Sequence, residues 1–183
     1  SANIMGIDVY DSDTVDIVCD GHFLPFVDGA FDGVWVQAVL EHVVRPDDVV
    51  REISRVLNCN GVVYAETPFM QQVHEGAFDF SRYTLLGHRY LFRTFTEIKI
   101  GGVGGPGEVL AWSIRSFVLS IFRIRALATL VWAVTAIPLK LCDKLADTRA
   151  QYDHSSGVFF LGRKSGETIS PKELVDLYAG FDS

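Results

Sequence analysis

The sequence predicts an α/β fold in which helices cover a mostly parallel sheet, formed as a single domain over residues 1–183. Two observations lead to this prediction. Short apolar runs bounded by turn residues alternate with longer segments of helical periodicity, which is the pattern of parallel strands joined by helices. A chain of 183 residues, 49% of them hydrophobic, is also long enough to bury one sizeable core.

The first half of the chain supplies four of the expected strands and the main helix. The strands are expected at Ile4–Val9, Val15–Cys19, Gly33–Gln37 and Gly61–Ala65. A helix is expected over about Pro46–Leu57, because its apolar residues recur at helical spacing and proline is tolerated in a first helical turn. The helix should stop at the turn-forming residues 58–61.

The second half is expected to add an insertion, an apolar helical segment and a last strand. Residues 67–95 are rich in aromatic residues and histidine, and we expect them to form a substrate-side insertion with a short helix near Leu85–Phe92. The apolar helical segment follows over 107–146. The remaining elements are a strand at Val158–Leu161 and a tail helix with a capping box of Ser170 and Glu173.

The apolar segment allows several interpretations. Its uncharged run, Ala126–Leu139, is shorter than the roughly 20 residues needed to cross a bilayer, so no stable membrane span is expected. A helix lying on a membrane surface would need a richly basic face, whereas this one has only a few arginines. A buried helix or the interface of a homodimer is therefore the favoured interpretation.

Charge and cysteine content exclude some classes of protein. The net charge of −7 and the lack of clustered Lys and Arg argue against nucleic acid as a partner. Cys19, Cys59 and Cys142 lie far apart and form no CxxC pair, so neither a disulfide framework nor a zinc site is expected. The chain carries no signal-peptide pattern at its start, and a reducing cytoplasm is the expected location.

The stretch Gly101–Gly107, GGVGGPG, contains the letter pattern G-x-G-x-x-G of a dinucleotide-binding loop. Such a loop also needs an acidic residue roughly 20 positions further on, to bind a ribose hydroxyl. That position falls in IRALATLVWAV, which contains no acidic residue. The stretch is therefore interpreted as a flexible bend between a strand and a helix, and a nicotinamide-linked dehydrogenase is the least favoured function.

Acidic residues near three of the expected strands are better candidates for cofactor binding. Asp8 and Asp20 stand at the carboxyl ends of the first and second strands, where ligands bind in open parallel sheets, whereas Asp32 precedes the third strand. One carboxylate there can accept both ribose hydroxyls, and the next can accept the amine of an adenine. A turn-forming role for Asp8, beside Asp11 and Asp13, is an equally good interpretation.

The sequence around these residues resembles a known family. The run DIVCDGHFLPFVDGAFDGVWVQAVLEHV, followed by REISRVLNCNGVVYAETP, is similar to the middle of class I S-adenosylmethionine-dependent methyltransferases of the type 11 group. The resemblance covers about Asn3–Pro68. It implies a Rossmann-like fold with S-adenosylmethionine as cofactor. It further implies that the cofactor-binding residues are Asp8, Asp20, Gly21, His22, Leu24, Gln37, Ala38 and His42.

The family's first strand, its glycine-rich loop and the helix that follows have no counterpart in this sequence. In the family's strand order, 3-2-1-4-5-7-6, that strand stands in the middle of the sheet, so the sheet would be left with unpaired edges. Three arrangements are expected as alternatives. The strand at Ile4–Val9 pairs with the fourth strand, another subunit fills the space, or the chain is part of a longer gene product.

Residues after the fifth family strand, ETPFMQQVHEGAFDFSRYT, are expected to face the acceptor substrate. His74 is the candidate general base, because an oxygen acceptor benefits from a base with a pKa near 7. The alternative is that His74 and His88 are ordinary loop histidines. Aromatic residues from Phe69 to Phe92 either form an acceptor pocket or pack the loop on the core. No metal site is expected, since His74, Glu75 and Asp79 fit no standard ligand set.

The predicted function is transfer of a methyl group from S-adenosylmethionine to a small molecule, at oxygen, by an enzyme that is truncated in this sequence. The competing hypothesis is a non-catalytic methyltransferase-like module that uses its apolar second half as a subunit interface.

Overall fold

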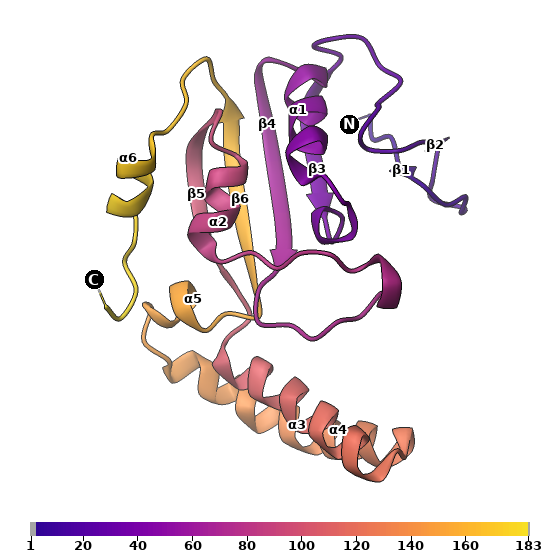
Figure 1. Ribbon diagram of the computed structural model, residues 1–183, viewed down its shortest axis with the longest axis vertical. Coiled ribbons are helices and arrows are strands. Elements are labelled where there is room, and N and C mark those ends of the chain that lie inside the picture. The colour runs from indigo at the N-terminus through magenta and orange to yellow at the C-terminus, as the bar shows by residue number, and fades with distance from the viewer. Residues whose placement is uncertain (1–2, 183) are drawn as a thin grey trace.

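The computed structural model describes residues 3–182, so residues 1, 2 and 183 of the predicted domain lie outside the described residues. Its strands form two separate sheets, one of two strands and one of four, with helices packed against the larger sheet (Figure 1). The predicted α/β class is therefore confirmed. The strand order is β1-β2 in the smaller sheet and β3-β4-β6-β5 in the larger one.

The larger sheet is built on one long central strand. β4 (Leu57–Pro68) pairs in parallel with β3 (Phe31–Gln37) and antiparallel with β6 (Gly157–Lys164), and β6 pairs antiparallel with β5 (Phe95–Val103). The strands β3, β4 and β5 consequently run in the same direction and β6 runs against them. The turn expected at residues 58–61 is instead an irregular start of β4, where the register with β3 shifts.

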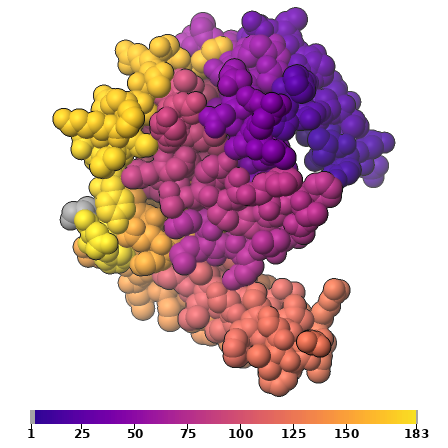
Figure 2. All heavy atoms as spheres, in the orientation of Figure 1, coloured from indigo at the N-terminus to yellow at the C-terminus, as the bar shows by residue number. Residues whose placement is uncertain are grey.

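The smaller sheet consists of β1 (Ile7–Asp8) and β2 (Ile17–Val18), which pair in parallel. Because β1 pairs with β2 alone, the expectation that Ile4–Val9 pairs with the fourth family strand, which is β3, is wrong. Among residues 3–182 the outer edge of β3 has no strand beside it, and Trp35 on β3 is 72% exposed. The N-terminal segment leaves an opening next to the body of the molecule in Figure 2.

Two helices cover one face of the larger sheet (Figure 1). α1 (Pro46–Val56) begins with the expected proline and buries Val49, Val50 and Ile53, and α2 (Leu85–Leu91) begins at Thr84, whose side chain accepts a hydrogen bond from Gly87 N. Under them the rings of Phe92 and Phe160 stack at 4.9 Å. The core cluster consists of Val36, Leu40, Val49, Val50, Ile53, Leu57, Val63, Ala65, Leu91, Phe92, Phe95 and Phe160.

The apolar segment forms a hairpin of two long helices that projects from the body of the protein (Figures 1 and 2). The helices α3 (Pro106–Phe122) and α4 (Arg125–Cys142) pack on each other, and within the hairpin only Gly107, Ala111, Ala128 and Ala136 are buried. The interpretation as a core helix is therefore wrong. The helical stretch Arg125–Leu145 is long and apolar enough to cross a membrane, because it extends beyond the uncharged run considered in the sequence.

The glycine string at Gly101–Gly107 serves close packing. A side chain at Gly102 would lie 2.7 Å from Ser155 Cβ, and one at Gly105 would lie 2.6 Å from Asp143 Cγ. The first amides of α3 are taken by Asp143, which accepts hydrogen bonds from Gly107 N at 2.6 Å and Glu108 N at 3.1 Å. A helix N-terminus that already holds a carboxylate does not offer its amides to a phosphate, which supports the interpretation as a bend.

The remaining elements are short. They are the 3-10 turns η1 (Leu40–His42), η2 (Gly76–Phe78) and η3 (Asp143–Leu145) and the helices α5 (Ala150–Asp153) and α6 (Pro171–Asp176). α6 has the capping box that the sequence predicts: Ser170 and Glu173 each accept a hydrogen bond from the other's backbone N–H.

Candidate functional site

The two carboxylates predicted to bind adenosine lie at the same edge of the smaller sheet. Asp8 is the last residue of β1, and Asp20 stands two residues beyond β2, which runs parallel to β1. Both side chains are exposed, and one oxygen of Asp8 accepts a hydrogen bond from the amide of Tyr10 at 3.0 Å. The bond from Tyr10 shows the turn-forming role expected as the alternative for Asp8, and the exposed carboxylates can still accept bonds from a ligand at this edge.

The loop that follows β2 is held by local hydrogen bonds. Asp20 Oδ1 accepts from the amide of His22 at 2.9 Å and lies 2.6 Å from its Nδ1, and these bonds lower the pKa of Asp20. Gly21 packs near Val49 of α1, and Leu24 donates its amide to Glu52 at 3.0 Å. The loop is thus tied to α1, with Asp20 ionised at neutral pH.

The carboxyl end of β3 leads into the next part of the site. Gln37 ends the strand and accepts a hydrogen bond from Trp35 Nε1 at 3.2 Å. Ala38 adopts a left-handed conformation with φ of 53°, which L-residues rarely do, and its amide donates to Glu66 O at 3.1 Å. This bend starts η1 directly and so places Glu41 and His42 beyond the end of the strand.

Three ionisable side chains from two separate segments meet at this point. His42 Nε2 lies 3.1 Å from His74 Nε2, and the rings stand edge to face. Glu41 Oε1 lies 3.6 Å from the first of these nitrogens and 3.9 Å from the second. Glu41 is 1% exposed, its Oε2 has no hydrogen-bond partner within residues 3–182, and burial raises the pKa of this carboxyl.

The loop that carries His74 is fixed by an ion pair between Asp79 and Arg82. Asp79 accepts from Arg82 Nη2 at 2.6 Å and from the amide of His74 at 3.0 Å, and the guanidinium holds its pKa well below the usual range. Arg82 also donates to the carbonyl groups of Gln71 and Gln72. The imidazole of His74 is therefore presented by an ordered loop, with its Nδ1 3.4 Å from Asp79 Oδ2.

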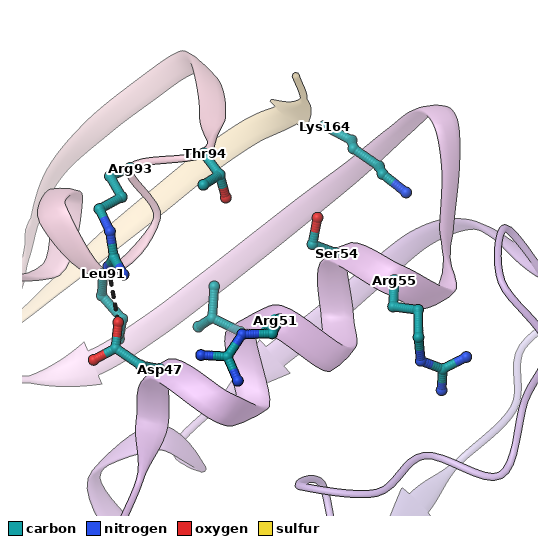
Figure 3. Close-up of a pocket in the computed structure, with 9 residues that line it drawn as sticks. Asp47, Arg51, Ser54, Arg55, Leu91, Arg93, Thr94 and Lys164 are labelled. Carbon is teal, nitrogen blue, oxygen red and sulfur yellow. Dashed lines mark hydrogen bonds and ion pairs between the residues drawn. The ribbon is translucent and has the colours of Figure 1, made fainter. Parts of the chain in front are cut away.

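A separate basic pocket lies between α1 and the segment Leu91–Thr94 (Figure 3). Its volume is about 340 Å³, and Lys164, which donates to Leu57 O at 2.7 Å, marks its position at the amino end of β4. Arg93 pairs with Asp47 across it at 2.8 Å. Since Asp8, Asp20 and Gln37 lie at the carboxyl ends of their strands, this pocket is not the predicted cofactor site. A second hollow of about 300 Å³, beside His22, adjoins that site.

The aromatic residues of the insertion do not form one pocket. Phe92 belongs to the core, whereas Phe78 is 61% exposed and Phe80 is 50% exposed. His88 lies in the short helix expected near Leu85–Phe92, so the alternative that it is a loop histidine is wrong. It is buried within α2, and desolvation lowers its pKa to about 3.

Sequence reasoning missed Glu41 as a member of the site and did not foresee the roles of Asp79 and Arg82. Glu41 directly precedes His42, so its proximity to a predicted site residue was the available signal. Asp79 and Arg82 are three residues apart in the segment expected to face the acceptor. The contact between His42 and His74 spans 32 residues and depends on how the insertion folds back.

Comparison with known proteins identifies the class of fold. Residues 4–65 match the family model described as Methyltransferase domain, and no curated protein matches the chain. A protein of Bacillus halodurans C-125, provisionally described as a methyltransferase, superposes with a TM-score of 0.53 at 14% identity, over 90% of this chain and 82% of that one.

Two further solved structures have similar folds. A Haloferax volcanii protein, provisionally described as a methyltransferase and solved in complex with the Trm112 activator, gives a TM-score of 0.53 at 17% identity, over 88% of this chain. Haemonchus contortus phosphoethanolamine N-methyltransferase 2 gives a TM-score of 0.50 at 14% identity, over 80% of this chain. The chain spans 66% of the length of the first protein and 36% of the second.

The fold is thus that of the class I S-adenosylmethionine-dependent methyltransferases. Within it, residues 4–65 match the model of the methyltransferase domain family, and the cofactor that this match implies is S-adenosylmethionine. The residues present fit the adenosyl half of that cofactor, because two exposed carboxylates stand at the tips of adjacent parallel strands. Asp8, Asp20 and the end of β3 would hold it.

Proposed function

We propose that the protein takes part in methyl transfer from S-adenosylmethionine to a small-molecule acceptor, at an oxygen atom. The observation that carries this proposal is the placement of Asp8 and Asp20 at one edge of β1 and β2, inside the segment that matches the methyltransferase domain. The bound cofactor would supply an electrophilic methyl group.

The protein's own residues would bind and orient the two reactants. Asp20 is ionised at neutral pH and would accept hydrogen bonds from the adenosyl group, with Gly21, His22 and Leu24 around it. Gln37, Ala38 and His42 would lie beside the methionine half. His74, whose Nε2 lies 3.1 Å from His42 Nε2, would face the acceptor, and its imidazole would accept the proton of a hydroxyl group.

Calorimetric titration with S-adenosylhomocysteine tests cofactor binding. We expect a micromolar Kd, which Asp20→Ala should weaken by about tenfold or more, since a charge-assisted hydrogen bond contributes roughly 1.5–3 kcal/mol. Asp32→Asn is the matched control, because Asp32 stands at the amino end of β3, bonded to Asn58, and should leave the affinity unchanged.

The competing function is a non-catalytic module that associates through its apolar hairpin, which the exposure of that hairpin favours. The two functions differ in the same titration. If the protein gives no binding heat at millimolar S-adenosylhomocysteine, the enzyme proposal fails and the module is supported.

A further inference from the structure

The cluster of Glu41, His42 and His74 has the geometry of a metal centre. Its three ligand atoms, one carboxylate oxygen and two Nε2 atoms, form a triangle with sides of 3.1, 3.6 and 3.9 Å. The point equidistant from all three lies about 2.1 Å from each, which matches the length of Zn–N and Zn–O bonds. The triangle therefore encloses a site of the right size for one ion.

The hydrogen bonds around the two imidazoles favour the same conclusion. His42 Nδ1 lies 2.8 Å from the carbonyl oxygen of Phe78, which can only accept, so the proton of the neutral ring is at Nδ1. His74 Nδ1 faces the carboxylate of Asp79 at 3.4 Å, which favours a proton there too. Both Nε2 lone pairs then point toward a common space at a separation of 3.1 Å, and a positive charge between them would relieve their repulsion.

Glu41 distinguishes a metal ion from a shared proton. A proton on the line between the two imidazoles would not involve the carboxylate, whose Oε1 is beyond hydrogen-bond distance of both rings. Yet this carboxylate is buried, and one of its oxygens has no hydrogen-bond partner among the described residues. An ion bound by all three groups would compensate the cost of burying the carboxylate.

We infer that Glu41, His42 and His74 bind one divalent cation of the zinc type, with two nitrogen ligands and one oxygen ligand. The side chains of His42 and His74 are 20% and 30% exposed, so one side of the site is open to solvent. Three protein ligands and an open position are typical of a zinc ion that binds water or a substrate oxygen. Phe78 and Asp79 would fix the orientation of the two imidazoles.

In the proposed methyl transfer, this ion would bind the acceptor hydroxyl and lower its pKa, so that the proton passes to bulk water. His74 would then be a ligand and not the base. That catalytic role rests on the proposed function, whereas ion binding does not, and the two can fail separately.

Metal binding is tested on the full chain without cofactor or acceptor. After removal of metal with a chelator, titration with Zn²⁺ followed by elemental analysis should give one ion per chain. His42→Ala and His74→Ala should each weaken Zn²⁺ binding by about 100-fold, and Glu41→Gln by about tenfold or more. Glu75→Gln and His154→Ala are the matched controls, since both residues are exposed and lie outside the triangle.

Co²⁺ provides a second measurement, because its visible absorption reports the coordination geometry. Tetrahedral bands that disappear in His74→Ala but persist in His154→Ala support the site. The inference is overturned if the chelator-treated wild-type protein binds no stoichiometric Zn²⁺, or if the double variant His42→Ala, His74→Ala binds Zn²⁺ as tightly as the wild type.

The hairpin of α3 and α4 carries an independent inference about a partner. Many of its large apolar side chains are exposed, and they recur along one side of each helix: Leu110, Phe117 and Ile121 on α3, and Leu130, Val134, Ile137 and Leu141 on α4. Water-exposed apolar surface of this extent marks a contact with another apolar phase or molecule.

Charge decides between the candidate partners. From residue 109 to residue 139 the sequence has Arg115, Arg123 and Arg125 and no acidic residue, although the net charge of the whole chain is −7. All three arginines are exposed, and two of them flank the tip of the hairpin. Although the arginines are few, no acidic residue offsets them: a second copy packed in the same direction would bring the positive tips together, whereas an anionic lipid surface would neutralise them while covering the apolar side chains.

We propose that the hairpin lies on a membrane surface that contains anionic lipids. In flotation experiments, the protein should bind vesicles of equal parts phosphatidylcholine and phosphatidylglycerol, and bind pure phosphatidylcholine at least about fivefold less. The double variant Phe117→Ser, Ile121→Ser should lose binding to both. The control is Val175→Ser, which removes an equally exposed apolar side chain from α6.

Sedimentation of the same variants tests the alternative. The membrane proposal is overturned if the protein stays unbound with both vesicle types, or if it forms a dimer that Phe117→Ser, Ile121→Ser dissociates while vesicle binding is absent.

Discussion

His88 illustrates, at the scale of a single residue, how burial controls protonation in this protein. Its ring packs between those of Tyr83 and Phe92, and its Nε2 has no hydrogen-bond partner among the described residues. Desolvation lowers its pKa to about 3 from the ordinary value of 6.5. The folded protein therefore holds this imidazole neutral, while the unfolded chain protonates it as the pH falls through 6.5.

We predict that His88 makes stability depend on pH. Its contribution is fully present above pH 6.5 and is lost as the pH falls toward 3, by up to about 1.4 kcal/mol per pH unit. For the wild type, the free energy of unfolding measured with urea at pH 7, 6 and 5 should fall with pH at this slope. His88→Leu should have a smaller slope, and equal slopes for the two proteins would refute the assignment.

Individual site residues were predictable from the sequence to the extent that their environment is local. Asp20 and His22 interact two residues apart at the end of a short strand, so their proximity followed from the sequence alone. The cluster of Glu41 with His74 was not predictable in this way. Its members come together through a fold of the insertion that is fixed by Asp79 and Arg82, and no periodicity in the sequence reports that contact.

At the scale of elements, the start of α3 depends on a residue far away in the sequence. Asp143 accepts from the amides of Gly107 and Glu108, and thereby supplies the negative charge that a helix N-terminus favours. Because Asp143 directly follows α4, the same contact closes the base of the hairpin.

We predict that Asp143→Ala lowers the free energy of unfolding by about 1–2 kcal/mol, as the loss of a helix cap does. Asp147→Ala is the control, because Asp147 is exposed and pairs only with the neighbouring Arg149. Urea denaturation of the three proteins provides the measurement. Equal midpoints for both variants would show that the Asp143 contact contributes nothing.

The helices and strands themselves were largely predictable, since each has a local signal. Pro46 and Ser170 mark helix starts, and apolar alternation locates the strands. The exposure of the hairpin was not predictable, because the same apolar sequence pattern is found in a helix that is buried in a core and in a helix that another molecule covers.

At the scale of the whole molecule, the division of the strands into two sheets sets the distribution of stability. The smaller sheet pairs only two residues on each strand, and most of its side chains are exposed. The larger sheet carries the core cluster and the long ladder between β4 and β6. Segments with few buried contacts open locally at low free energy.

We predict that amide hydrogen exchange separates the two sheets. Amides of β1 and β2 should exchange at least about 100-fold faster than those of β4 and β6, because opening the smaller sheet exposes little apolar surface. Mass spectrometry of peptides from residues 4–20 and 57–68 measures this ratio. Saturating S-adenosylhomocysteine should slow the first peptide more than the second, and uniform exchange would contradict the prediction.

The uncovered edge of β3 has a practical consequence for protein engineering. It leaves one side of the seven-residue strand β3 without a neighbouring strand among the described residues, and the indole of Trp35 lies exposed on β3. A synthetic peptide that docks there in trans would shift the tryptophan emission. Tryptophan fluorescence would thus report the addition of a strand to this sheet.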